Sequence, residues 1–320
     1  MKLSRSVTCL LLAYVTALGT GIASGQDYPS KPVRMIATQP GGLTDVVARL
    51  IAPGLTANLG KQFIVDNRTA IVAVETAAKA PPDGYTILVN GSAFWLMPLL
   101  RDNVTWDPFK DFVPITMAVR SPSILVVHPS IPVKSVSELI ALAKAKPGTL
   151  NYAAGTIGAT PHLAAELFKY MAGVNMVRVG YKGTGPAVTA VMAGESQVSF
   201  PNAGSVMPHV KSGRLRGLAV CSAQPSDLAP GLPTVAATGL PGYESVSPQA
   251  VFAPAKTPPA LIKRLNEEIV RVMHTPEVRE RFFNTGLEVV ASTPQELGAA
   301  MKSEFVRMGK VIKEVGIREE

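Results

Sequence analysis

Residues 33–55 constrain the fold most, because a strand, a glycine turn and a helix follow one another there. The apolar run over residues 33–37 is typical of a buried strand, and Pro40 ends it. Gly41 and Gly42 let backbone N–H groups approach a ligand with no side chain in the way. Apolar residues then recur at helical spacing, at Val46, Val47, Leu50, Ile51 and Leu55. Since the first N–H groups of a helix are free and lie at the positive end of its dipole, the turn is predicted to bind an anion.

Strand and helix patterns alternate along the rest of the chain. Further strands are predicted over residues 62–66, 85–89, 123–128, 150–153 and 197–200, and helices over 76–80, 135–144 and 187–193. Ser135 is predicted to cap its helix, with Glu138 at the third helical position. This order favours open, mostly parallel sheets covered by helices, in which ligands sit beyond the carboxyl ends of the strands.

Three later segments repeat the pattern of the first turn. Residues 151–162 give a strand, a small-residue loop and a helix start at Pro161-His162. Residues 181–186 precede a helix for which Pro186 suits the first position. Residues 200–205 follow a short strand. Four small-residue turns at strand ends can together surround a small anion with backbone donors and hydroxyls.

The N-terminus is typical of a cleavable export signal. Lys2 and Arg5 form a positive start, residues 7–17 are largely apolar, and small residues at 23–25 offer a cleavage site before Gln26. The apolar stretch is shorter than the roughly 20 residues that a membrane span needs. We therefore expect residues 1–25 to be a signal peptide and the mature chain to be periplasmic.

Composition excludes several classes of protein. About 295 mature residues suffice for two domains. Of the two cysteines only Cys221 remains after cleavage, so it is expected to be a small core residue and not part of an intramolecular disulfide. The formal charge of +8 is scattered along the chain, so it can steer anions but gives no nucleic-acid footprint.

Catalytic and metal motifs are also missing from the sequence. The four histidines have no paired spacing, so no metal site is expected. No Gly-x-Ser-x-Gly elbow occurs, and no histidine and carboxylate pair stands near a candidate nucleophile. We expect neither a cofactor nor an enzymatic activity.

Short motifs along the mature chain resemble the TctC/Bug family, the extracytoplasmic solute-binding receptors of tripartite tricarboxylate transporters. They include Pro40-Gly41-Gly42 with Asp45, Asp83-Gly84-Tyr85-Thr86, Gly155 with Gly158 and His162-Leu163, Tyr181-Lys182-Gly183, and Pro241-Gly242-Tyr243-Glu244. The resemblance implies a type II periplasmic binding protein fold, with two α/β domains flanking a ligand cleft. It also implies a first domain of residues 26–125 plus 230–320 and a second of 126–229.

The resemblance further implies a ligand and its binding positions. The family binds carboxylates largely through backbone amides and ordered waters. Carried onto this sequence, the ligand-binding residues are Gly41, Gly42, Thr44, Asp45, Gly155, Thr156, Gly158, Thr160, Lys182, Gly183 and Asn202. The implied partners are a small organic acid and the membrane components of a tripartite tricarboxylate transporter, with the receptor itself a monomer.

The chain departs from the family pattern after Asn67-Arg68. Residues 69–74 are a shortened and nearly glycine-free segment at a position that borders the cleft mouth in the family, so its effect on specificity stays open. Gly180 and Ser199 also replace residues common in the family. These differences leave the ligand undecided among dicarboxylates, tricarboxylates, amino acids and aromatic acids.

Individual residues keep a structural interpretation beside the functional one. Asp45 suits the first helical turn as well as a ligand contact, and His162 suits a loop cap. Lys182 is as consistent with a solvated loop as with an acid site, while Trp95 and Phe94 fit either a cleft wall or apolar packing. Two other functions stay open, namely a ligand-sensing receptor for a membrane signalling partner and a secreted enzyme on a related scaffold.

Overall fold

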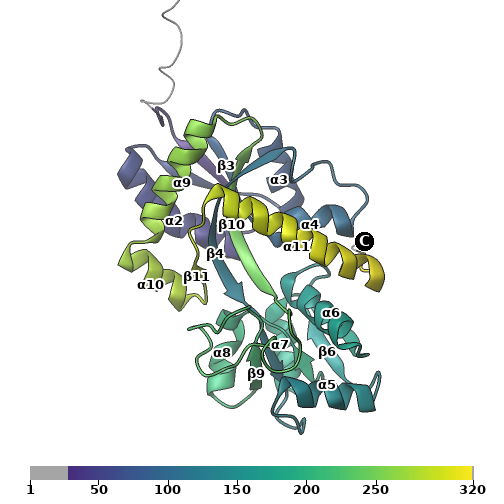
Figure 1. Ribbon diagram of the computed structural model, residues 1–320. Helices are drawn as coiled ribbons and strands as arrows, with labels where there is room; N and C mark the ends of the chain where they lie inside the picture. Colours follow the sequence, from purple (N-terminus) through teal and green to yellow (C-terminus); the bar gives the residue numbers. More distant parts are fainter. Residues whose placement is uncertain (1–27, 319–320) are drawn as a thin grey trace, which may run out of the picture.

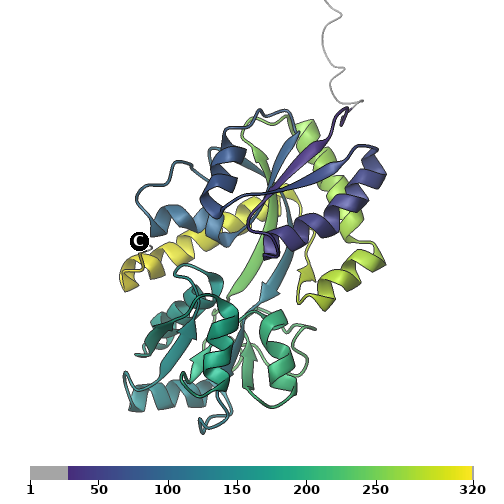
Figure 2. The same ribbon diagram turned by 180° about the vertical axis from the view of Figure 1, so that it is seen from behind.

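The computed structural model describes residues 28–318 and folds them into two α/β lobes joined by two extended segments (Figures 1 and 2). The predicted signal peptide, residues 1–25, lies outside the described residues. One lobe is built on a six-stranded sheet and the other on a five-stranded sheet. The α/β class expected from the alternating pattern is confirmed.

The first lobe takes both ends of the described chain. Its strands are β1 (Val33–Ala37), β2 (Phe63–Asn67), β3 (Thr86–Gly91), β4 (Phe112–Pro122), β10 (Val246–Pro254) and β11 (Glu288–Val289), in the order β11-β4-β10-β3-β1-β2. Its helices are α2 (Leu43–Leu59), α3 (Ala70–Ala78), α4 (Ser92–Leu100), α9 (Pro259–Met273), α10 (Pro276–Asn284) and α11 (Pro294–Val315).

Alternation along β1 explains why helices cover both faces of this sheet. Val33, Met35 and Ala37 are fully buried in the core that contains α2 and α9. Ile36 points the other way, into the core that contains α3, α4 and α11. Because successive side chains of a strand point to opposite faces, a strand with buried apolar residues on both faces requires cover on both sides.

The second lobe holds the middle of the chain. Its strands are β5 (Ile124–Val127), β6 (Asn151–Ala154), β7 (Val177–Gly180), β8 (Val198–Ser199) and β9 (Arg216–Val220), in the order β7-β6-β8-β5-β9. Its helices are α5 (Val136–Ala145), α6 (Thr160–Ala172), α7 (Thr184–Met192) and α8 (Ala203–Lys211). Helices α5 and α6 share one core with the sheet, and α7 and α8 share another on its opposite face.

The prediction of mostly parallel sheets is wrong, since both sheets are mixed. β1 pairs in parallel with β2 and β3, and β6 with β7 and β8. The pairs formed by β10 with β3 and β4, by β11 with β4, and by β5 with β8 and β9 are antiparallel. The two-lobe arrangement explains this difference. β4 leaves the first lobe and β10 re-enters it in the opposite direction, so β10 is antiparallel to its neighbours β3 and β4.

Two crossing segments join the lobes side by side (Figure 1). β4 continues through Ser123 directly into β5, and the chain returns through Ser245 into β10. Backbone hydrogen bonds tie the crossings together, from the Ser245 amide to the Cys221 carbonyl at 2.7 Å and from the Cys221 amide to the Ser123 carbonyl at 2.8 Å. Cys221 is fully buried there, as expected of a small core residue.

The return crossing bears on the expected domain boundary near residue 230. The Tyr243 hydroxyl donates to the Ala164 carbonyl at 2.9 Å, and the Ser137 hydroxyl donates to the Thr238 carbonyl at 2.6 Å. Both contacts join residues beyond 230 to helices of the second lobe. We therefore propose that the second domain extends to about residue 244 and that the crossing back lies at Ser245.

Two predicted elements begin earlier in the structure. The expected helix over 76–80 and the expected loop over 69–74 form one helix, α3, because Ala73, Val74 and Ala77 give it a buried face. α7 begins at Thr184, so Pro186 stands at its third position and not its first. The ring is tolerated there because the first N–H groups of a helix have no partner within it.

Capping and packing predictions are otherwise met. The Ser135 hydroxyl accepts from the Glu138 amide at the start of α5. Phe94 and Trp95 are both buried in α4, which decides between cleft wall and packing in favour of packing. The Trp95 indole donates to Oε2 of Glu304 at 3.0 Å, and burial raises the pKa of that carboxyl to about 7.

Candidate functional site

The carboxyl ends of the first sheet point at the second lobe. β1, β2 and β3 are parallel, so the turns after them leave from one edge. β4 ends at the same edge as β3, because both pair antiparallel with β10. Since β4 then passes into the second lobe, this edge faces that lobe.

The second sheet presents its carboxyl ends to the same place. β6, β7 and β8 are parallel, so the loops at Gly155, Lys182 and Asn202 leave from one edge. The Ile124 amide donates to the Pro201 carbonyl at 2.8 Å, which puts that edge at the crossing. The two carboxyl edges therefore face each other, the arrangement in which open α/β sheets bind ligands.

In the first loop, Asp45 is held by the protein itself. Its carboxylate accepts from the Gly41 amide at 2.9 Å, from Arg49 Nε at 2.8 Å and from Asn67 Nδ2 at 2.9 Å. Burial opposes ionisation, but these hydrogen bonds and the charge of Arg49 outweigh it and lower the pKa of Asp45. The side chain thus fixes the loop on the first helical turn.

The glycine amides of this loop already have partners. Gly41 donates to Asp45, and the Gly42 amide donates to the Gln39 carbonyl at 3.0 Å. The Thr44 hydroxyl accepts from the Thr38 amide at 3.0 Å. Gly42 gives α2 no side-chain cap, so the N–H groups of residues 43–45 are the donors left for an anion.

In the second lobe, the loop at residues 155–160 is held at both ends. The Gly158 amide donates to His162 Nδ1 at 3.1 Å, which confirms His162 as a loop cap. The Gly155 carbonyl accepts from Arg178 Nη2 at 2.8 Å. Thr156 is exposed, and α6 starts at Thr160 with no side-chain cap. The Thr156 hydroxyl and the first backbone N–H groups of α6 are therefore the groups with which this loop can bind an anion.

The Lys182 loop lies directly against the Gly155 loop. A Cβ on Gly155 would come within 2.9 Å of the Gly183 carbonyl carbon, so the two backbones touch. Gly183 has φ +105°, a conformation that favours glycine. Lys182 itself is exposed. The structure thus brings together the second-lobe residues that the sequence placed at separate turns.

Two buried residues at the crossing were missed by sequence reasoning. Ser123 Oγ and Gln249 Oε1 have no hydrogen-bond partner among the described residues, and Asn202 Oδ1 has none either. Ser123 pairs with Asn202 as an isolated bridge, and the Gln249 side chain lies against Gly91 at the start of α4. Buried polar atoms of this kind call for a ligand or an ordered water.

His162 and Glu304 give stability opposite dependences on pH. Burial, reinforced by the charge of Arg178, lowers the pKa of His162 to about 4. Lowering the pH from 6.5 should therefore destabilise the fold, since unfolded His162 binds a proton that the folded imidazole refuses. For Glu304, lowering the pH from 7 should stabilise the fold, because the folded carboxyl takes up the proton first.

Single variants should expose each slope. In Glu304→Gln only the His162 effect remains, so the free energy of unfolding should fall by roughly 2 kcal/mol when the pH is lowered from 6.5 to 4.5. In His162→Gln only the Glu304 effect remains, so the free energy of unfolding should rise by a similar amount when the pH is lowered from 7 to 4.5. The wild-type protein should vary less than either. Urea unfolding at several pH values checks this, and parallel curves for all three proteins would contradict the assigned burial.

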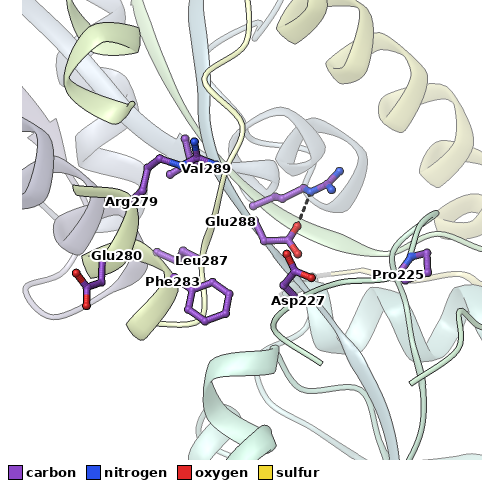
Figure 3. A pocket seen from close by; sticks show the side chains of 9 residues that line it. Pro225, Asp227, Arg279, Glu280, Phe283, Leu287, Glu288 and Val289 are labelled. Atoms are coloured by element: carbon purple, nitrogen blue, oxygen red, sulfur yellow. Dashed lines mark hydrogen bonds and ion pairs between the residues drawn. The ribbon is translucent and has the colours of Figure 1, made fainter. Parts of the chain in front are cut away.

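A separate cavity of about 500 Å³ lies between the lobes at the β11 end of the first sheet (Figure 3). Asp227 from the second lobe and Glu288 from β11 both line it, and Glu288 is paired with Arg120 at 2.9 Å. None of the predicted binding residues lines this cavity. It is a seam between the lobes and not part of the facing carboxyl edges.

Residues 28–318 contain no helix with the length and apolar character of a bilayer span.

The family model described as "Tripartite tricarboxylate transporter family receptor" matches residues 47–317 of the chain. The chain belongs to this family. TctC family members are periplasmic binding proteins that act as receptors and not as enzymes.

This TctC family member is similar in sequence to known proteins and similar in fold to proteins of known structure. Protein BugT of Bordetella pertussis (strain Tohama I) is 33% identical over 327 residues, which cover 99% of each chain. The structure of R. palustris Rpa4515 with adipate has a TM-score of 0.77 at 33% identity and covers 91% of this chain and 99% of its own. MatC from Rhodopseudomonas palustris with bound malate has a TM-score of 0.73 at 26% identity, covering 89% and 100%.

Proposed function

We propose that this TctC family receptor captures a small carboxylate between the two facing carboxyl edges and delivers it to the membrane components of a tripartite tricarboxylate transporter. The observation that carries the proposal is the convergence of helix starts from both lobes on one crossing. α2, α4, α6, α7 and α8 all begin at this place without a side-chain cap. Free helix N–H groups from two sides suit a carboxylate.

The proposed binding positions divide into donors and supports. Thr44, Thr156, Thr160, Lys182 and Asn202 remain candidates to face the acid. Asp45 and His162 instead hold the loops that present those donors. Gly41, Gly42 and Gly183 use their amides within their own loops, and an added Cβ on Gly155 or Gly158 would meet a neighbouring residue within 3 Å.

The ligand class is proposed from the chemistry of the site and from two relatives. Adipate is bound in one related structure and malate in another, and both are small dicarboxylates. A micromolar complex needs about 8 kcal/mol. Several dipole-assisted hydrogen bonds and burial of the apolar part of the acid can supply it. We propose that the protein is a monomer that binds one acid. We also propose that its N-terminal signal peptide directs the protein to the periplasm.

A thermal-shift screen of the mature protein tests the function. The panel should contain adipate, malate, citrate, an amino acid and an aromatic acid, with adipamide as the neutral control for adipate. An acid at about 100 times its dissociation constant should add near 2.7 kcal/mol and raise the midpoint by several degrees. Absence of a shift with every acid, for a protein shown to be folded, would contradict carboxylate capture.

A further inference from the structure

Arg178 reaches from β7 towards the ligand edge of the second lobe. It pairs in register with Tyr152 of β6, whose hydroxyl contacts Glu166 of α6, so Arg178 lies on the α6 face of the sheet. A Cβ on Gly180 would lie 3.3 Å from both terminal nitrogens of Arg178. The side chain therefore runs along its own strand towards the carboxyl end, over a residue with no side chain.

At that end the guanidinium holds a ligand loop. Nη2 donates to the Gly155 carbonyl at 2.8 Å, and Gly155 in turn touches Gly183. One arginine thus supports the contact between the two loops that carry Thr156 and Lys182.

The positive charge of Arg178 has no counter-ion among the described residues. The carboxylate of Glu166, on the same face, is taken by Lys169 at 2.9 Å and by the Tyr152 hydroxyl. Arg178 Nε is buried and has no hydrogen-bond partner in the described part of the chain. A partly buried cation without a counter-ion is costly, so an anion at the adjacent edge would relieve that cost.

We propose that Arg178 determines the preference of this receptor for anions, by holding the Gly155 loop and by placing an uncompensated positive charge behind the amides that meet the ligand carboxylate. The inference rests on the proposed function. It makes Arg178 a positioning residue that acts through the loop, because its guanidinium donates to the Gly155 carbonyl. Burial, and after it the charge of Arg178, lowers the pKa of His162, whose Nδ1 accepts from the Gly158 amide at the other end of the loop.

Calorimetry with the acid that gives the largest thermal shift tests the proposal. Arg178→Met should weaken binding about ten- to a hundredfold, in line with loss of a charge-assisted interaction. Arg178→Lys keeps the charge and should recover part of the loss. Arg214→Met is the matched control, because Arg214 is an exposed second-lobe arginine beside His209, and it should bind within about twofold of wild type.

Gly180→Ala is a second probe that keeps the arginine. The added Cβ should push the guanidinium by a few tenths of an ångström and weaken acid binding less than Arg178→Met. Unchanged affinity in a folded Arg178→Met protein would overturn the proposal while leaving carboxylate capture intact. Equal losses in the Met and Lys variants would overturn the role of charge. A wild-type protein that binds no acid would overturn the function and this inference together.

Discussion

Gly155→Ala should weaken acid binding by about tenfold to a hundredfold while the protein stays folded. The new Cβ would sit 2.9 Å from the Gly183 carbonyl carbon and 3.0 Å from its Cα. Both atoms belong to the backbone and cannot rotate away, so the two second-lobe loops must separate. Overpacking of this kind costs about 1–3 kcal/mol, and here it opposes the loop arrangement that meets the ligand.

Gly185→Ala provides the control for this variant. Gly185 lies in the neighbouring loop-to-helix segment, has no atom within 4 Å of an added Cβ, and is exposed. Its affinity by calorimetry should match wild type. If Gly155→Ala also binds the acid as wild type does, contact between the two loops is not required for binding.

Trp95→Ala should lower the free energy of unfolding by about 3–5 kcal/mol, the cost of removing a large buried aromatic side chain. Trp95 is 1% exposed and packs edge-on against Phe94 and Phe252, at interplanar angles of 83° and 65° with ring centroids 6.3 Å and 6.1 Å away. Truncation also leaves the Glu304 carboxyl without its indole donor. Urea unfolding measures the loss, which is a large share of a typical total stability.

Phe109→Ala is the comparison for the tryptophan variant. Phe109 is 39% exposed and has an edge contact with Phe305, so its removal should cost under about 1 kcal/mol. A Trp95→Ala protein of nearly wild-type stability that has lost acid binding would return Trp95 to the cleft wall. That result would contradict the packing seen in α4.

The fold could be predicted where a local pattern decides the structure. β1 occupies the predicted residues 33–37, since a short run of apolar residues that ends before Pro40 and two glycines favours a buried strand. Thr293 and Glu296 form a capping box at the start of α11, which the Thr-Pro-Gln-Glu sequence predicts. The mixed sheets could not be predicted in this way, because the direction of β10 depends on where the chain re-enters the first lobe. The α3 boundary was missed because Ala73 and Val74 lie in a run that also resembles a loop of small apolar residues.

The candidate site was predictable as four turns around one small anion, but not in the hydrogen bonds that hold those turns. Each glycine turn has its own sequence pattern, so Gly41, Gly155, Gly183 and the Asn202 segment could be named. Nothing local indicates that Gly41 and Gly42 spend their amides within the loop, since that depends on Asp45 and Gln39 folding back. Ser123, Gln249 and Arg178 had no signal at all, because their roles arise from pairings between segments that lie far apart in the sequence.

Backbone amide NMR of the mature protein, recorded with and without a saturating acid from the screen, tests capture between the two lobes. We expect the largest chemical-shift changes at residues 43–45, 155–160, 182–183 and 202, in two lobes at once. Changes confined to the seam cavity around Asp227 and Glu288, or to one lobe alone, would contradict capture between the facing carboxyl edges.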